Sequence, residues 1–357
     1  MTWYDAPSHT AGAALVARLA DLPGGMPDID LRAGGLRVQP SDGTAEAAQE
    51  LGLVANPAGL ETLDVVIEAA DPAAVQPFWQ TVLGYPAGLE DPLRRDPAFA
   101  VRRLTEPRPL RNRIHVDVVR AADAVDRARE VTGREPSGAF GVMLPDDEGN
   151  EVDLVPGETL PGTTDWLALF GAMTFYPTSS PAPLVTAAAE LADAAGVPLM
   201  IDVRREGVAF DSGKDQWEES PEFVALAQRI ETAAKDLGLS ADPARLRFVQ
   251  FGIDAADVPA LRAFWVTLLG YEEDPRPHVT DIYDPRRLNP VLFFQQLEEP
   301  REQRNRIRFE LAVPDPERTV EAAMAAGGRI LSEKPYLVAD PEGNEVVVRT
   351  PKTRPST

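Results

Sequence analysis

Apolar side chains recur along the chain with helical and with strand periodicity, and the same order of elements occurs twice. Between Pro72 and Leu83, apolar residues fall at positions i, i+3, i+4 and i+7, which predicts an amphipathic helix. This stripe consists of Val75, Phe78, Trp79 and Val82. Over 63–68, 114–119 and 151–155, apolar and polar residues alternate, which predicts strands with one apolar and one polar face. Strands and helices mixed in this way predict the α+β class.

The pattern is duplicated, because residues 1 to about 157 (copy one) match residues 173 to about 350 (copy two) in order. Met1-Thr2-Trp3-Tyr4 matches Met173-Thr174-Phe175-Tyr176 near the two beginnings. Later matches pair Phe78-Trp79 with Phe264-Trp265, Leu83-Gly84-Tyr85 with Leu269-Gly270-Tyr271, Asn112-Arg113-Ile114 with Asn305-Arg306-Ile307, and Glu148-Gly149-Asn150-Glu151-Val152 with Glu342-Gly343-Asn344-Glu345-Val346. Ordered matches over a whole unit indicate a tandem duplication.

Each copy divides again into two modules. The first module is predicted as helix, strand and helix, at 11–21, 29–38 and 44–52 in copy one and at 183–195, 200–210 and 221–237 in copy two. The second module is predicted as a strand–helix–strand unit followed by strand–helix–strand–strand. The expected modules are therefore 1–57, 58–157, 166–243 and 244–352.

The second modules resemble the vicinal oxygen chelate superfamily, which includes glyoxalases, bleomycin-resistance proteins and extradiol dioxygenases. The resemblance in copy one rests on Asp71-Pro72 through Phe78-Trp79, on Asn112-Arg113-Ile114-His115-Val116-Asp117 and on Asp147-Glu148-Gly149-Asn150-Glu151. In copy two the matching stretch runs from Arg247 to Arg349. The resemblance implies βαβββ-type modules that build a cup-shaped site.

The first modules more faintly resemble pterin-4a-carbinolamine dehydratase. The resemblance rests on Gly24-Gly25-Met26-Pro27-Asp28-Ile29-Asp30-Leu31-Arg32 and on Ala195-Gly196 through Ile201-Asp202-Val203-Arg204. Where that family carries its catalytic His-His-Pro motif, this chain has Gly25 and Met26, and Val197 and Pro198. None of these four side chains can shuttle a proton, so both modules are expected to be inactive in dehydration.

The resemblance to the vicinal oxygen chelate superfamily also implies metal ligands on the polar faces of the strands. Carried over residue by residue, they are Asp64, His115 and Asp153, although the superfamily more usually has histidine and glutamate in place of the two aspartates. One imidazole and two carboxylates suit Fe(II), Mn(II) or Zn(II) with open positions for a chelating substrate. The same positions in copy two include Arg308 and Val347, so copy two is expected to bind no metal.

A ligand site without metal is the alternative for these modules. Its candidate residues are Arg103, Gln250, Gln296 and Arg308. Trp79 and Trp265 belong to the helical stripes and are predicted to lie in the core. The remaining histidines, His9 and His278, lie in predicted loops without a partner pattern.

Composition narrows the functional classes. A formal net charge of −22 disfavours nucleic acids and anionic membranes as partners. The absence of cysteine excludes disulfides and thiolate sites and fits a reducing cytoplasm. No apolar run of membrane-spanning length and no basic, apolar leader at Met1–Asp5 occur, so a cytoplasmic location is expected.

Three hypotheses about function remain. The first is a protein that binds a small organic molecule in a cup-shaped site and retains no dehydratase activity. The second is a metal-dependent lyase, isomerase or dioxygenase that uses copy one. The third is a non-catalytic scaffold in which the two copies pair within one chain as a homodimer would, with further homodimerisation left open. The only cofactor expected is a divalent metal, for the second hypothesis.

Overall fold

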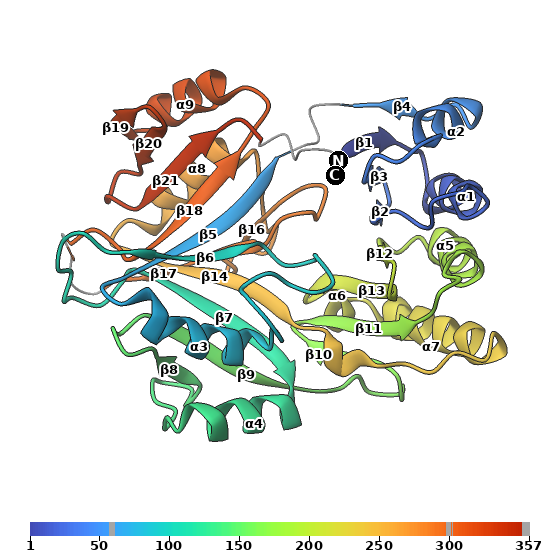
Figure 1. The fold of residues 1–357 in the computed structure, drawn as a ribbon, viewed down its shortest axis with the longest axis horizontal. Coiled ribbons are helices and arrows are strands. Elements are labelled where there is room, and N and C mark those ends of the chain that lie inside the picture. Colours follow the sequence, from blue (N-terminus) through green and yellow to red (C-terminus); the bar gives the residue numbers. More distant parts are fainter. Residues whose placement is uncertain (57–60, 298–300, 302, 352–357) are drawn as a thin grey trace. The chain divides into compact units, whose positions relative to one another are not determined.

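The computed structural model describes residues 1–56, 61–297, 301 and 303–351, and the module limits expected at 57, 58 and 352 lie outside these residues. The chain forms two compact units, coloured along the sequence in Figure 1. The first unit comprises 1–60, 119–122 and 156–248, and the second unit comprises 61–118, 123–155 and 249–357. Each unit therefore contains residues of both copies. No helix of the described ranges is both long enough and apolar enough to cross a bilayer.

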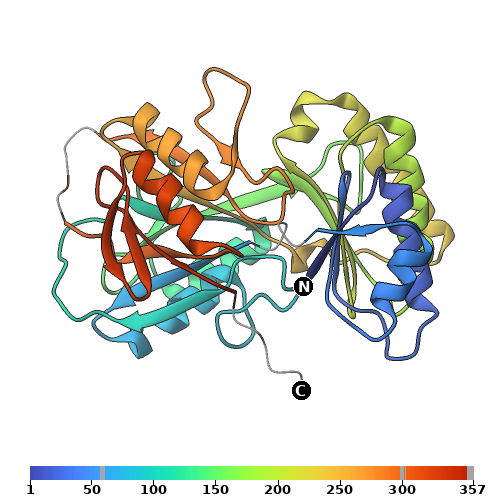
Figure 2. The same cartoon turned by 90° about the horizontal axis from the view of Figure 1, so that it is seen from above.

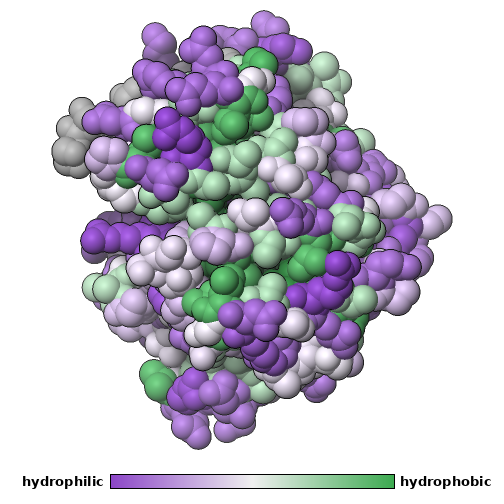
Figure 3. All heavy atoms as spheres, turned by 90° about the vertical axis from the view of Figure 1, so that its right-hand side faces the viewer, coloured by the Kyte–Doolittle hydropathy of each residue, from purple (hydrophilic) through white to green (hydrophobic). Residues whose placement is uncertain are grey.

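The first unit is built on a sheet with helices along one face (Figure 2). Its strands follow the order β10-β11-β13-β12-β2-β3-β1-β4. They are β1 (Thr2–Asp5), β2 (Ile29–Arg32), β3 (Gly35–Val38), β4 (Val54–Ala55), β10 (Leu167–Leu169), β11 (Gly171–Pro177), β12 (Met200–Arg204) and β13 (Gly207–Lys214). The helices are α1 (His9–Ala20), α2 (Thr44–Glu50), α5 (Ala182–Ala195), α6 (Gln216–Glu219) and α7 (Pro221–Asp236), followed by a 3-10 turn at Pro243–Arg245. Figure 3 shows the side that carries the helices, with hydrophobic residues across its middle and hydrophilic residues around them.

Two segments expected as single strands, 29–38 and 200–210, are hairpins in the structure. Each turns at a glycine with positive φ, Gly35 at 157° and Gly207 at 151°, a conformation that other residues rarely adopt. A Cβ on Gly35 would also lie 2.5 Å from the carbonyl oxygen of Tyr4. The prediction of one continuous strand in each segment was wrong, because the alternation of apolar residues continues across a tight turn.

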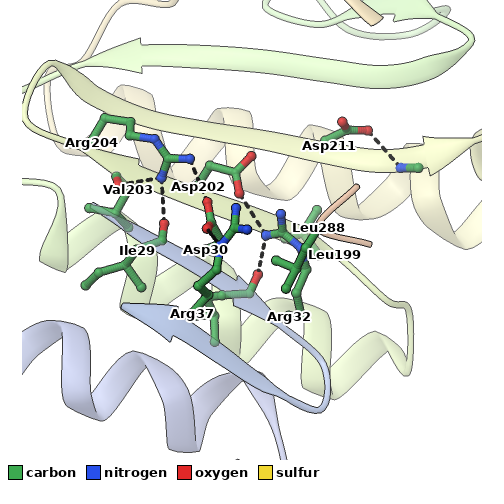
Figure 4. Close-up of polar contacts among 12 residues, drawn as sticks. Ile29, Asp30, Arg32, Arg37, Leu199, Asp202, Val203, Arg204, Asp211 and Leu288 are labelled. Atoms are coloured by element: carbon green, nitrogen blue, oxygen red, sulfur yellow. Dashed lines mark hydrogen bonds and ion pairs between the residues drawn. The ribbon is translucent and has the colours of Figure 1, made fainter. Parts of the chain in front are cut away.

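Charged residues join the two copies inside the first unit, where β2 pairs with β12 and Asp30 lies opposite Asp202. Arg204 donates to Asp30 at 2.6 Å and Arg32 donates to Asp202 at 2.8 Å (Figure 4). Arg37 also donates a hydrogen bond to Asp30, at 2.6 Å. Burial would raise the pKa of Asp30, but the surrounding arginines hold this pKa well below its usual range. The repeated Asp-x-Arg residues therefore form a reciprocal ion-pair network between the copies.

The second unit contains two sheets. The β5/β18 sheet has the order β19-β20-β21-β18-β5-β6, and the β7/β14 sheet has the order β15-β16-β17-β14-β7-β9, with β8 beside β9. The strands of the first are β5 (Thr62–Ala69), β6 (Phe99–Arg103), β18 (Ile307–Ala312), β19 (Arg329–Glu333), β20 (Tyr336–Ala339) and β21 (Glu345–Arg349). Those of the second are β7 (Ile114–Ala121), β8 (Met143–Pro145), β9 (Glu151–Thr159), β14 (Phe248–Ala255), β15 (Glu272–Glu273), β16 (Ile282–Tyr283) and β17 (Val291–Gln296). Each sheet thus combines strands of copy one with strands of copy two.

The helices described in the second unit are α3 (Pro72–Leu83), α4 (Ala122–Thr132), α8 (Val258–Leu269) and α9 (Pro316–Ala325). The stripe of α3 and its counterpart on α8 lie in one hydrophobic core. Trp79 and Trp265 are fully buried, which confirms their prediction as core residues. Each indole also donates a hydrogen bond of 3.0 Å to a buried carboxylate, Asp146 for Trp79 and Asp340 for Trp265.

The repeated Asn-Arg-Ile and Gly-Asn residues hold the two copies together in the second unit. The backbone N–H of each arginine donates to the asparagine of the other copy at 2.8 Å: Arg113 to Asn305, and Arg306 to Asn112. The guanidinium Nε of each arginine donates at 2.9 Å to the Gly-Asn turn of the other copy: Arg113 to Asn344, and Arg306 to Asn150. The strongest sequence matches between the copies are therefore structural contacts between them.

Candidate metal centre

The β7/β14 sheet presents a polar face opposite its core face. Along β7, Ile114, Val116 and Val118 lie in the hydrophobic core, so the intervening His115 and Asp117 lie on the other face. The same alternation places Gln250, Gly252 and Asp254 of β14 and Asp153 of β9 on this polar face.

Three side chains of this face converge. His115, Asp117 and Asp153 each offer a donor atom, and these atoms lie within 4.8 Å of one another. The His115 Nε2 atom lies 3.4 Å from an oxygen of Asp117. The amide of Gln250 donates to the other oxygen of Asp117 at 2.8 Å, which orients this carboxylate. One imidazole and two carboxylates form a donor set suited to Fe(II), Mn(II) or Zn(II).

A missing side chain makes room for the imidazole. A Cβ at Gly252 would lie 2.1 Å from Cε1 and 2.4 Å from Nε2 of His115. On the next strand, the Phe293 ring meets the His115 ring edge-on with a centroid separation of 5.6 Å. The imidazole is thus held between a glycine backbone and an aromatic ring.

The electrostatics of the face favour a neutral imidazole. Burial lowers the pKa of His115 to about 4, although Glu151 opposes the shift. Burial also raises the pKa of Asp153, and the charge of Glu151 adds to this effect. A neutral imidazole keeps a lone pair for a metal ion near pH 7.

Two buried polar atoms of this face indicate whether a metal ion or a polar ligand would fit there. Among the residues that the structure describes, His115 Nδ1 and Gln250 Oε1 are buried without a hydrogen-bond partner. Leaving a buried polar atom unpaired costs about 1–3 kcal/mol. A metal ion or polar ligand at this face would offset that cost, so the residues present fit a divalent ion.

Comparison with known proteins places the second unit in a family. The sequence profile of a glyoxalase-like domain matches residues 64–155 and again 250–349, together just over half of the chain. The chain belongs to the glyoxalase-like domain family. The matched segments leave out 1–63 and 156–249, where the resemblance to a pterin dehydratase stays a prediction.

A solved structure of a point mutant of glyoxalase I from Zea mays is similar to the chain. The similarity covers 81% of this chain and 94% of that chain, with 11% sequence identity and a TM-score of 0.38. No curated protein matches the chain.

The pairing of strands from different copies separates the three expected metal ligands. His115 and Asp153 meet on the β7/β14 sheet, but Asp64 lies on the β5/β18 sheet, in register with Glu310. The physical reason is that β5 of copy one pairs with β18 of copy two, while β14 of copy two lies beside β7 of copy one. Gln250 therefore occupies, next to His115, the position that the sequence assigned to Asp64. Asp117 was not expected as a ligand, although its spacing of two from His115 already places both on one strand face.

The candidate ligand-binding residues of the glyoxalase-like modules divide in the same way. Gln250 lies beside His115 and Arg308 lies on the other sheet, opposite Val66. Arg103 pairs with Ala69, a core residue, so strand alternation puts it on the core side rather than on the polar face.

Gln296 likewise pairs with Ala255, a core residue, and its amide donates to the Ala256 carbonyl oxygen at 3.1 Å. The side chains on the polar faces are Arg102 and Gln295, one position earlier in each strand. The expected residues were therefore displaced by one, because a shift of one residue along a strand exchanges its faces.

The other two histidines are not part of the group formed by His115, Asp117 and Asp153. His9 is not in a loop: it begins α1, and its Nδ1 lies 3.0 Å from Asp193 of α5 while Nε2 lies 2.8 Å from the Leu199 carbonyl oxygen. It therefore links the first helices of the two copies. His278 is exposed in a turn.

Proposed function

We propose that this glyoxalase-like protein binds a small organic molecule on the polar face of the β7/β14 sheet, at a divalent metal ion held by His115, Asp117 and Asp153. The convergence of these three side chains within 4.8 Å carries the proposal. When bound, the ion would act as a Lewis acid toward ligand oxygens, which suits molecules with two neighbouring oxygen donors.

Each residue of the centre has a distinct part in this proposal. His115 supplies a neutral nitrogen because burial lowers its pKa to about 4. Asp117 supplies a carboxylate whose second oxygen is held by Gln250. Asp153 supplies the other negative charge from β9. The unpaired Gln250 Oε1 atom can accept a hydrogen bond from the bound molecule.

The proposal restricts metal binding to one of the two sheets. On the β5/β18 sheet, Arg308 takes the position of His115 and Val347 takes the position of Asp153. Neither a guanidinium group nor a valine side chain donates a lone pair to a metal ion. Only one ion per chain is therefore expected, although the module occurs twice.

The first unit has a non-catalytic part in the same proposal. Gly25, Met26, Val197 and Pro198 supply no acid or base for dehydration. His9, which could do so, is bonded to Asp193 and to the Leu199 carbonyl oxygen. We expect no turnover of a pterin carbinolamine in a direct assay, and measurable turnover would overturn this part.

Metal loading tests the main proposal. The purified chain is loaded with Mn(II) or Zn(II), dialysed and measured by mass spectrometry of the metal, with about one ion per chain expected. His115→Ala, Asp117→Asn and Asp153→Asn should each lose the ion. Asp64→Asn is the matched control, because Asp64 lies on the other sheet. An unloaded wild-type chain, or loss of the ion in Asp64→Asn with retention in Asp117→Asn, would overturn the proposal.

A further inference from the structure

The polar face of the β5/β18 sheet carries arginines where the β7/β14 sheet has uncharged side chains. The exchanges are Arg308 for His115, Arg349 for Val155 and Arg102 for Gln295. With Arg108, these residues form what we call the arginine face. Because the two faces are built from equivalent strands, the difference lies in their side chains and not in their architecture.

Carboxylates on the arginine face are shared rather than matched one to one. Glu68 accepts from Arg108 at 2.5 Å and also pairs with Arg308. Glu310 pairs with Arg102 at 2.6 Å, and Arg349 lies 3.6 Å from its other oxygen.

Asp64 adds one more weak contact to Arg349, at 3.5 Å. In these contacts between described residues, four guanidinium groups therefore meet three carboxylates, which is one positive charge more. The β7/β14 face has the opposite sign, because Asp117, Asp153 and Asp254 meet Arg301 there and His115 is neutral.

Two guanidinium nitrogens of the arginine face are buried and make no hydrogen bond within the part of the chain that the structure describes. They are the Nε atom of Arg308 and the Nε atom of Arg349, which has only the Glu310 oxygen at 3.6 Å near it. Both side chains are mostly buried, with 15% and 22% exposed, whereas that of Arg102 is 47% exposed. Solvent therefore reaches the edge of the face, while donors inside it remain unsatisfied.

We propose that the arginine face binds the carboxylate of a small organic acid, with Arg308 and Arg349 as its donors. A guanidinium group presents its N–H bonds in a planar fork that matches a carboxylate, and such charge-assisted bonds are about twice as strong as neutral ones. A monoanion also balances the single excess positive charge. This site is separate from the metal centre and does not depend on it.

Calorimetric titration with benzoate tests the proposal, with benzamide as a neutral probe of nearly the same shape. Benzoate should bind with a Kd of about 1 mM or tighter, and benzamide should not bind. Arg308→Gln and Arg349→Gln should each weaken benzoate binding about tenfold or more, since each removes a charged donor. Arg127→Gln is the control, because this exposed arginine pairs only with Asp123 within α4 among the contacts described.

Thermal unfolding of each variant separates a lost site from a lost fold. Arg102→Gln serves as the second variant, because the Arg102 side chain is half-exposed, unlike those of Arg308 and Arg349. It should weaken benzoate binding by a smaller factor in a folded protein. Equal binding of benzamide, absence of benzoate binding, or unchanged affinity in folded Arg308→Gln and Arg349→Gln would overturn the proposal. Loss of benzoate binding in His115→Ala would also overturn it, because that result would place the acid at the metal centre.

Discussion

Gly252→Ala should separate the geometry of the candidate metal centre from its chemistry. The backbone of Gly252 lies outside the left-handed region, so alanine introduces no torsional strain. The new methyl group would instead lie 2.1 Å from Cε1 of His115 and 2.7 Å from the Phe293 ring. Ordinary contact begins at 3.4 Å, so the imidazole must retreat by about 1 Å or rotate away.

The size of the effect follows from this overlap. Overpacking a filled site costs about 1–3 kcal/mol, and replacing a strand glycine returns about 0.5–1 kcal/mol. The net loss of stability should therefore be about 0–2.5 kcal/mol. Metal affinity should fall more sharply, by about 10- to 100-fold, which is the range seen when the orientation of a metal ligand is disturbed.

Three measurements check this prediction: calorimetric titration with Mn(II) or Zn(II), urea unfolding, and NMR titration of the His115 ring. The displaced ring should gain solvent, so its pKa should rise from about 4 toward its ordinary value. Gly34→Ala is the control, because a Cβ there meets nothing within 4 Å. Unchanged metal affinity together with an unchanged His115 pKa would refute the steric argument.

Three further predictions concern stability. Asp30→Asn should cost about 3–5 kcal/mol in urea unfolding, because it leaves Arg37 and Arg204 with unbalanced charge. Asp202→Asn removes the carboxylate bonded to Arg32 and should cost less; equal losses would contradict this order. Asn344→Ala and Asn150→Ala remove equivalent hydrogen bonds from Arg113 and Arg306, the arginines of the opposite copy. Each variant should therefore lose about 2–4 kcal/mol of unfolding free energy. A twofold difference between the two losses would contradict this equivalence. Burial and the charge of Asp284 raise the pKa of Glu61 to about 7. Between about pH 4.5 and pH 7 the folded state therefore binds more protons than the unfolded state. The free energy of unfolding should fall by on the order of 3 kcal/mol as the pH rises through this range. Glu61→Gln should remove this loss in urea unfolding at pH 8 and have little effect at pH 4, and a stabilisation equal at both pH values would contradict the assignment.

Local periodicity was sufficient to predict most elements. The apolar stripe of α3 and its counterpart on α8 predicted these helices and placed Trp79 and Trp265 in the core. The duplication was equally visible, because matched residues recur in order. Both follow from the sequence because helical spacing and chain order involve neighbours along the chain.

The sequence predicted only in part which face of a strand each residue occupies. Alternation alone places His115, Asp117 and Asp153 on polar faces. It misplaced Arg103 and Gln296 by one position, because the faces exchange at every residue and the ends of short strands carry little pattern to fix the register.

Only the tertiary structure decided which strands meet. The two copies have nearly equivalent strands, so β5 could pair within copy one or with β18 of copy two, and no local pattern distinguishes these choices. Pairing between copies separates Asp64 from His115 and brings Gln250 and Gly252 to the imidazole instead. The sequence by itself therefore determined the elements, the duplication and most of the donor residues. Contacts between the copies, such as the one between Asp117 and Gln250, decided which further side chains complete each site, and spacing along the chain carries no information about such contacts.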